Sequence, residues 1–287
     1  MMSSLRQQMT ELMILCGFAK STQDTYLHQI SQLAKYFNRS PELISEEDIR
    51  QYMLHCHLEK HWAHSSCRQF IHAARFLFDR VLERPLSKKK LPLPKKEIKI
   101  PELLSRKEVR QIIEHCQNEK HKTALMVTYA TGIRVSELTA LKVDDLDGER
   151  GVIKIRAGKG KKDRFVDFTD GLKQCLRAYW YEYRPIHYLF YSYTRNRPYT
   201  TSTFQRAYLR AKLSAKIHKQ GGIHALRHAY ATHQLEDGMP LSQLQQMLGH
   251  KQISCTLRYT HWVRCTKVKP SKPFDLLTPK TPKKTKQ

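Results

Sequence analysis

Four short segments of the chain contain polar side chains that an ordinary hydrophobic core would not choose. They are ATGIRVSEL with Arg134, AGKGKKDR with Lys159, IHALRHAYATH, and LGHKQISCTLRYTHW. In the third segment, His224, Arg227 and His228 stand at positions i, i+3 and i+4. If this segment is helical, the three side chains share one face, which groups two imidazoles with a guanidinium.

The fourth segment joins a histidine to a tyrosine. Gly249 and His250 end an apolar stretch that we expect to be helical, and Tyr259 follows in a polar context. A tyrosine hydroxyl can attack a phosphodiester, and arginine forks can neutralise the charge that grows on the non-bridging oxygens. One proton must reach the leaving 5′ oxygen and one must leave the tyrosine, and each positioned group accelerates such a transfer by roughly 10²–10⁴.

Each of these residues also has a simpler explanation when it is taken alone. Arg134 could pair with Glu137 or Asp144, and Lys159 could be a charge at the tip of a hairpin. Either His224 or His250 could be a hydrogen-bonded interior residue. The combination of the four segments is what favours a shared reaction centre.

Taken together, the segments resemble the signature of the tyrosine recombinases, also called the phage integrase family. That signature is an arginine in A-T-G-x-R-x-x-E-L, a lysine in G-K-G, an H-x-L-R-H box, an L-G-H box and a tyrosine shortly after it, and all five stand here in order. The resemblance covers essentially the whole chain. It implies a site-specific DNA recombinase that cuts and rejoins strands through a 3′-phosphotyrosine link, without ATP, metal or another cofactor.

The resemblance also implies a role for each matching residue. It assigns catalysis to Arg134, Lys159, His224, Arg227, His250 and Tyr259. The two arginines hold the phosphate, and Lys159 is the acid that protonates the leaving group. His224 handles the proton at the nucleophile and the phosphate, while His250 hydrogen-bonds the phosphate. Tyr259 is the nucleophile.

Other residues near these boxes are expected to support them. Glu137 buttresses Arg134 from the next helical turn, and His228 supports the site from behind the reacting groups. Tyr230 lies further along the same segment, beyond His228, and is expected to pack in the protein interior. Three basic residues flank the hairpin lysine and suit the positioning of DNA phosphates: Lys161, Lys162 and Arg164.

The composition indicates a folded protein with a polyanionic partner. The 287 residues include 51 Lys and Arg against 26 Asp and Glu, a net charge of +25, yet 40% are hydrophobic. Nucleic acid is the first candidate partner and an anionic membrane surface the second. No run of about 18 apolar residues could span a membrane, and Arg6 and Glu11 interrupt any signal peptide. We expect a soluble cytoplasmic protein, without a disulfide framework because its seven cysteines are scattered.

The expected fold class is mainly α with a small β-sheet. Residues 1–84 are expected to form a bundle of four helices, which the resemblance identifies as a SAM-like core-binding domain. Ser21 and Thr22 are expected to cap the second helix and Ser45 the third. A mixed catalytic domain over 101–263 follows, with a β-hairpin around Gly158-Lys159-Gly160. Ser105 and Glu108 form a capping box at its start.

A Pro- and Lys-rich linker over 85–100 and a basic tail over 264–287 carry much of the charge. Residues 84–107 hold nine basic and two acidic residues, and the tail holds eight and one. We expect the linker to run extended along DNA phosphates. Its candidate DNA-binding residues are Lys88, Lys89, Lys90, Lys95 and Lys96.

Several alternatives stay open at this point. The protein could be an accessory DNA-binding protein without catalysis, or a type IB-like topoisomerase. The resemblance implies double-stranded DNA as partner and a homo-tetramer on it, in phage or transposon integration, dimer resolution or inversion. The segment HCHLEKHWAHSSC could hold zinc, although its spacing matches no closed motif.

Overall fold

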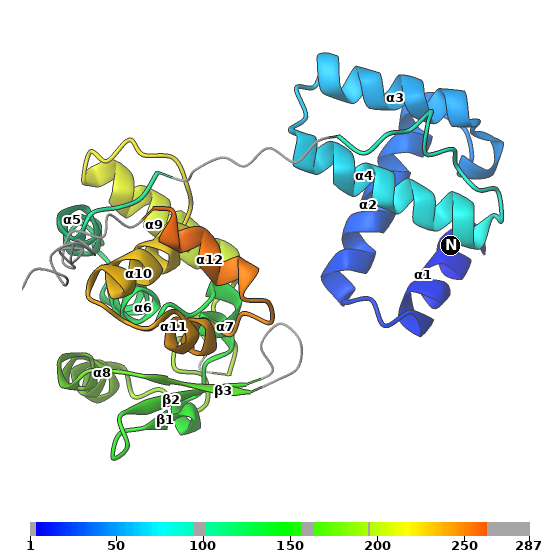
Figure 1. Cartoon of the computed structure of the whole chain (residues 1–287). Helices are drawn as coiled ribbons and strands as arrows, with labels where there is room; N and C mark the ends of the chain where they lie inside the picture. Colours follow the sequence, from blue (N-terminus) through cyan, green and yellow to red (C-terminus); the bar gives the residue numbers. More distant parts are fainter. Residues whose placement is uncertain (1–3, 95–101, 157–162, 195, 263–287) are drawn as a thin grey trace, which may run out of the picture. The chain divides into compact units, whose positions relative to one another are not determined.

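The computed structural model of the chain describes residues 4–94, 102–156, 163–194 and 196–262 (Figure 1). The chain divides into two compact units, residues 1–100 and residues 101–287. Helices dominate both units, and the described strands form one three-stranded sheet in the second unit. The predicted fold class, mainly α with a small β-sheet, is confirmed.

The first unit contains the four predicted helices. They are α1 (Ser4–Leu15), α2 (Lys20–Phe37), α3 (Glu46–Leu58) and α4 (His64–Arg75), with a 3-10 turn η1 (Pro41–Leu43) and a π-helical extension of α4, η2 (Phe76–Val81). The apolar stripe of α2 packs inward, since Leu27, Ile30 and Leu33 are buried. These residues share one core with buried side chains of α3, α4 and η2, so spacing at three and four residues located this interior correctly.

Of the two helix caps predicted in this unit, one is present and the other is not. Ser45 caps α3 as expected, because its hydroxyl accepts the backbone N–H of Asp48 while the Asp48 carboxylate accepts that of Ser45. Ser21 and Thr22 do not cap α2, which begins at Lys20 after an Ala19 without a side-chain cap. Both hydroxyl residues therefore lie inside the first turn of α2, and the buried Gln23 amide ties this turn to the preceding loop by donating to the Phe18 carbonyl.

The first half of the predicted linker is packed rather than extended and solvated. Leu86 and Leu91 are buried in the core of the first unit. Arg75 donates to the Leu91 carbonyl at 2.9 Å and Arg68 to the Pro94 carbonyl at 2.8 Å. Two arginines of α4 therefore fasten this segment to the bundle, an arrangement that its proline and lysine content does not reveal.

The second unit contains eight helices and the sheet among its described residues. Their bounds are α5 (Arg106–Glu114), α6 (Glu119–Thr131), α7 (Val135–Ala140), a 3-10 turn η3 (Val143–Asp145), β1 (Leu146–Asp147), β2 (Val152–Ile155), β3 (Arg164–Asp167), α8 (Asp170–Tyr183), α9 (Thr201–Ser214), α10 (His224–Glu236), α11 (Leu241–Leu248) and α12 (Ser254–Thr260). The strands are antiparallel in the order β1-β2-β3. The predicted hairpin is thus confirmed, and so is the Ser105–Glu108 capping box of α5.

Helices α6 and α10 lie side by side at the centre of the second unit (Figure 1). The sheet joins this helical layer through β3, which contacts α11. Inward residues such as Ile153 of β2 and Val166 of β3 face each other and are fully buried. The core therefore fixes the end of α6, the start of α10 and the end of α11 relative to one another.

Gly132 lies against an aromatic ring in this core. It ends α6 in the left-handed region, at φ 64°, and a Cβ there would overlap the ring of Tyr230 on α10. Tyr230 is buried and its hydroxyl donates to the Met247 sulfur at 3.5 Å, so its predicted packing role is confirmed. Only glycine combines this backbone angle with this approach.

Replacing Gly132 by Ala is expected to destabilise the second unit by about 3 kcal/mol, because left-handed strain and overpacking act together. Gly238→Ala is the matched control, since Gly238 also has positive φ but no atom within 4 Å of a Cβ. It should lose only the backbone contribution, about 1 kcal/mol. Chemical denaturation measures both variants, and equal losses would contradict the packing argument.

Candidate active site

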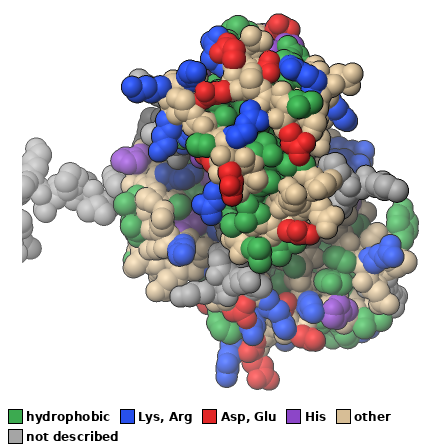
Figure 2. All heavy atoms as spheres, turned by 90° about the vertical axis from the view of Figure 1, so that its right-hand side faces the viewer, with side chains coloured by type: hydrophobic (Ala, Val, Ile, Leu, Met, Phe, Trp, Pro, Cys, Tyr) green, Lys and Arg blue, Asp and Glu red, His purple; other side chains and the backbone are tan. Residues whose placement is uncertain are grey.

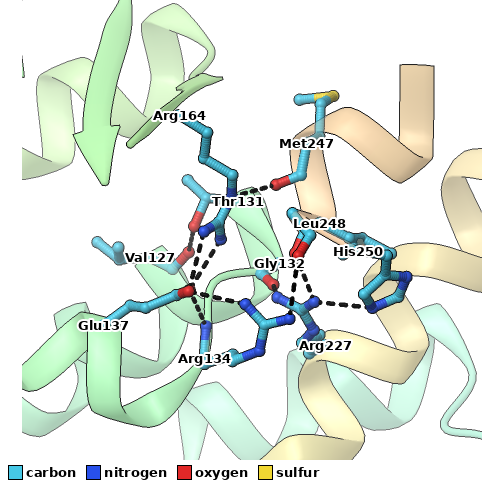
Figure 3. Close-up of polar contacts among 11 residues, drawn as sticks. Val127, Thr131, Gly132, Arg134, Glu137, Arg164, Arg227, Met247, Leu248 and His250 are labelled. Carbon is cyan, nitrogen blue, oxygen red and sulfur yellow. Dashed lines mark hydrogen bonds and ion pairs between the residues drawn. The ribbon is translucent and has the colours of Figure 1, made fainter. Parts of the chain in front are cut away.

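Four segments far apart in the sequence meet at one site in the second unit. Figure 3 shows three of the residues that they contribute, Arg134, Arg227 and His250. Arg134 immediately precedes α7, and Arg227 lies in the first turn of α10. His250 follows Gly249, which ends α11, while Tyr259 lies on α12. The structure therefore brings together five of the six predicted catalytic residues when His224, the first residue of α10, is included.

Arg227 is the most buried charge of this site, with 1% of its surface exposed. Its Nη1 donates to the Gly132 carbonyl at 2.6 Å and its Nη2 to the Leu248 carbonyl at 2.7 Å. Nη2 also donates to His250 Nε2 at 3.0 Å. Burial, and after it the charge of Arg134, lowers the pKa of Arg227 to about 10. The guanidinium consequently stays charged at neutral pH, held by carbonyl oxygens.

Arg134 is held by Glu137, the residue expected to buttress it. The Arg134 backbone N–H donates to Glu137 Oε2 and its Nη1 to Oε1, both at 2.8 Å. Its Nη2 approaches the Gly249 carbonyl at 3.4 Å. This guanidinium is about one-fifth exposed, with a relative side-chain accessibility of 20%, so it is the more accessible of the two arginines.

Arg164 points into the protein, in contrast to the expectation that it positions DNA phosphates. Its Nη1 and Nη2 donate to the two carboxylate oxygens of Glu137 at 2.9 and 2.8 Å, and its Nε donates to the Met247 carbonyl at 2.8 Å. Its side chain is only 11% exposed. The sequence did not reveal this contact, because an arginine suits a DNA phosphate and a buried carboxylate equally well. The structure shows that its partner is Glu137 of α7.

Glu137 therefore accepts hydrogen bonds from two arginines while it is buried. Burial by itself would raise the pKa of this carboxyl, but the hydrogen bonds and charge of Arg164, and then those of Arg134, lower it to about 2. The carboxylate is ionised throughout the physiological range. It organises the two guanidiniums as a fixed anion.

The tautomer of His250 follows from its two partners. An arginine can only donate, so His250 Nε2 accepts from Arg227 and carries no proton. The proton of the neutral ring is then on Nδ1, which donates to Thr256 Oγ1 at 2.8 Å. Burial, followed by Arg227 and Arg134, lowers the pKa of His250 to about 4. To donate from Nε2 to a phosphate, as expected, this ring must first give up its bond from Arg227.

Tyr259 is almost completely enclosed, with 2% of its surface exposed. Its hydroxyl lies 2.9 Å from His228 Nδ1. Its ring is parallel to the His250 ring, with centroids 6.3 Å apart, and edge-on to Trp262 at 5.5 Å. Burial raises the pKa of the Tyr259 hydroxyl, against the opposing effect of Arg227 and Arg258.

His228, rather than His224, contacts the tyrosine hydroxyl. His224 is exposed and its ring touches the His228 ring edge-on at 5.1 Å. Burial and then His224 lower the pKa of His228 to about 4, so this ring is neutral and can accept the hydroxyl proton in a hydrogen bond. Sequence reasoning had placed His228 behind the reacting groups; the i, i+4 pairing with His224 was the only signal for its direct role.

The remaining predicted site residues fall into two groups. Lys88, Lys89 and Lys90 form an exposed turn of the first unit, where Lys90 lies 3.6 Å from Glu46. Lys95, Lys96, Lys159, Lys161 and Lys162 lie outside the described residues.

No group of three or more metal-ligating side chains is arranged to hold a metal ion within the described residues. In the segment considered for zinc, Cys56 and Cys67 are buried in the helical core. His55 pairs with Glu59 and His57 with the Trp62 carbonyl. Within the described residues, this arrangement gives the zinc alternative no support. Nor is any helix of the described chain long and apolar enough to cross a membrane.

Charges of both signs are mixed on the face of the molecule that Figure 2 shows. Lys and Arg side chains alternate there with Asp, Glu and hydrophobic groups. The tail from Arg264 onward, which lies outside the described residues, alone holds eight basic residues and one acidic residue. The net charge of +25 is thus distributed unevenly along the chain.

Comparison with known proteins matches residues 102–264 to the phage integrase family and residues 5–88 to the phage integrase N-terminal SAM-like domain. The putative integrase/recombinase y4qK of Sinorhizobium fredii is 38% identical over 277 residues, which are 96% of this chain and 90% of that protein. Tyrosine recombinase XerA of Thermococcus kodakarensis is 38% identical over 175 residues, 60% of this chain and 62% of that protein.

The fold is also similar to that of solved structures. The Tn1549 transposon integrase in complex with transposon right end DNA superposes with a TM-score of 0.69 at 19% sequence identity, over 89% of this chain and 94% of that chain. At this identity the likeness concerns the fold alone.

Glu137→Gln is expected to flatten the acid dependence of stability. A carboxyl with a pKa of about 2 in the folded state and an ordinary value of 4.5 when unfolded stabilises the protein above pH 4.5. That contribution, about 3 kcal/mol, is lost as pH falls toward 2. Denaturation at pH values between 6 and 3 should show a smaller decline for Glu137→Gln than for wild type. The exposed Glu149→Gln is the control, and a wild-type decline in Glu137→Gln would contradict the assignment.

Proposed function

Because the chain belongs to the phage integrase family, whose members are tyrosine recombinases, we propose that it cuts and rejoins double-stranded DNA at a specific site through a 3′-phosphotyrosine at Tyr259. The observation that carries the proposal is the position of His250. It shares a hydrogen bond with Arg227 and stacks parallel to the Tyr259 ring. His250 thereby links Arg227 to the tyrosine, and Arg134 reaches the carbonyl of the preceding Gly249 at 3.4 Å.

The proposed chemistry is a transfer of the phosphoryl group from one oxygen to another. The Tyr259 oxygen forms a bond to phosphorus, and the bond from phosphorus to the 5′ oxygen breaks. The electron pair leaves with the 5′ oxygen, which takes up a proton, while the tyrosine proton passes to a base. Because the phosphodiester energy is kept in the tyrosine ester, the reverse attack by a 5′ hydroxyl rejoins DNA without ATP.

The two arginines supply the electrostatic part of this mechanism. Negative charge grows on the non-bridging oxygens in the transition state, and fixed guanidiniums in a dry site stabilise it far more than water does. Arg227 is held by the Gly132 and Leu248 carbonyls, and Arg134 by Glu137. Both charges are therefore in place before DNA arrives.

Proton transfer at Tyr259 is proposed to run through the histidine pair of α10. His228 is neutral and already hydrogen-bonded to the hydroxyl, and its ring touches that of the exposed His224. His228 is thus placed to receive the tyrosine proton, and His224, the histidine of the family signature, lies beside it at the surface. Lys159 is proposed as the acid for the 5′ oxygen, in keeping with the family signature.

The described site is closed, so DNA binding must open it. Arg227 and Tyr259 are 1% and 2% exposed, respectively, and no phosphate can reach them in this arrangement. The contacts to be exchanged are the Arg227–His250 bond and the Tyr259–His228 bond. Once released, His250 Nε2 would hydrogen-bond the phosphate after it takes up a proton, because the unprotonated nitrogen can only accept.

Double-stranded DNA is the proposed partner, in line with the DNA complexes of related integrases and with the positive charge of the chain. Lys88, Lys89, Lys90, Lys95 and Lys96, with Lys161 and Lys162, are proposed to grip phosphates. Recombination exchanges strands between two duplexes, which requires four protomers, so a homo-tetramer on DNA is part of the proposal.

The test is to trap the covalent intermediate. Incubating the protein with sheared genomic DNA from the cells that encode it, followed by denaturation, is expected to yield protein covalently joined to DNA. The recovered sequence defines the site, and a nicked duplex of that sequence should trap the adduct. Tyr259→Phe should form none, because it lacks the attacking oxygen.

Tyr230→Phe is the matched control for this test. It removes another buried tyrosine hydroxyl of the same unit, one that donates to the Met247 sulfur, and it should still form the adduct. An adduct with Tyr259→Phe would refute the nucleophile, and none with wild type would favour an accessory DNA-binding protein. Relaxation of plasmids without the recovered site would favour a topoisomerase.

A further inference from the structure

We infer that Arg164 is a positioning residue that offsets the charge of Glu137 and so leaves the charge of Arg134 available for the phosphate. This inference rests on the proposed function, since it concerns how the same site meets its phosphate. Arg164 itself need not touch the DNA.

The geometry places one carboxylate between two guanidiniums (Figure 3). Arg164 grips both Glu137 oxygens with its two Nη atoms, at 2.9 and 2.8 Å. Arg134 uses the same two oxygens, through its backbone N–H and its Nη1. Four donors thus share two acceptor atoms, and the bidentate pair belongs to Arg164.

The charges decide what this sharing does. A buried Glu137 with Arg134 as its only cation would form a neutral pair, and an ionised group in the interior holds its single counter-charge strongly. Arg134 would then carry no net charge toward a phosphate. With Arg164 present, the three groups together carry one positive charge, and Arg134 is the more exposed guanidinium, at 20% against 11%.

A second contact of Arg164 reaches the backbone that holds the other arginine. Its Nε donates to the Met247 carbonyl in the last turn of α11. The next two carbonyls, of Leu248 and Gly249, accept from Arg227 and Arg134, respectively. Arg164 of β3 therefore holds two anchors of the site. One is the Glu137 carboxylate, which binds Arg134, and the other is the end of α11, whose carbonyls bind Arg227 and Arg134.

Gly249 is fitted to this contact. It ends α11 at φ 61°, and a Cβ at this position would come within 2.9–3.0 Å of the Arg164 side chain. The glycine of the L-G-H box thus leaves room for the arginine of the hairpin strand. Two of the five signature boxes are joined by this single side chain.

The experiment measures the rate at which wild type and each Arg164 variant form the covalent adduct. The substrate is a nicked duplex with the site sequence that was recovered with wild-type protein. Arg164→Gln is expected to slow adduct formation by about tenfold or more while DNA affinity stays within about twofold. Arg164→Lys, which restores the charge without the fork, should recover part of the rate. The double variant Glu137→Gln/Arg164→Gln should be faster than Arg164→Gln, because it removes the carboxylate that neutralises Arg134. A double variant that is no faster than Arg164→Gln would overturn the inference.

A second substrate separates positioning from a loss of folded protein. In a duplex with a methylphosphonate at the scissile position, one charged non-bridging oxygen is replaced by a methyl group. The ratio of wild-type to Arg164→Gln rates should fall toward one on this duplex, because less charge must be met by Arg134. The folded fractions cancel when the ratio on this duplex is divided by the ratio on the ordinary duplex, and a quotient of one would overturn the inference. If Arg164→Gln does not fold, Arg164→Met, which also removes the charge, carries the same comparison.

Controls keep this test independent of the proposed function. Arg150→Gln removes an exposed arginine between β1 and β2, whose side chain is 83% exposed, and should change neither rate. If wild type forms no adduct, the proposed function fails; if wild type does and the Arg164 series does not behave as stated, only this inference fails.

Discussion

The site depends on burying the positive charge of Arg227, which water solvates far better than protein does. The carbonyl groups that replace the water come from the ends of two helices. Gly132 ends α6 and Gly249 ends α11, both in the left-handed conformation. Unpaired carbonyls at a helix C-terminus carry partial negative charge, so two helix ends facing one guanidinium stabilise it twice. The glycines that end these helices belong to two of the signature boxes, which explains why the boxes hold glycine beside their functional residues.

Much of the architecture could be predicted from local signals. The capping boxes at Ser45 and Ser105 and the hairpin were located correctly, because each depends on residues only a few positions apart. Ser21 and Thr22 were misassigned as caps, since α2 already begins at Lys20 and both residues lie inside its first turn.

The contacts within the site could not be predicted in the same way. Arg164 and Glu137 are 27 residues apart and Arg227 and Gly132 are 95 apart, so only the folded chain reveals the pairs. The five boxes identified the residues of the site but not which of them contact one another. His228 contacts the tyrosine hydroxyl, whereas His224 had been expected to do so. The packing of Leu86 and Leu91 was missed because the charge of the surrounding lysines obscured two isolated leucines.

The site combines two arginines that are held in place with a tyrosine that is buried, and the proposed chemistry requires Tyr259 to be the attacking residue. The most direct measurement is to digest the trapped protein–DNA adduct with protease and nuclease and to locate the nucleotide by mass spectrometry. The account predicts a nucleotide on the peptide that contains Tyr259, among the 14 tyrosines of the chain. A nucleotide on a peptide without Tyr259 would contradict it.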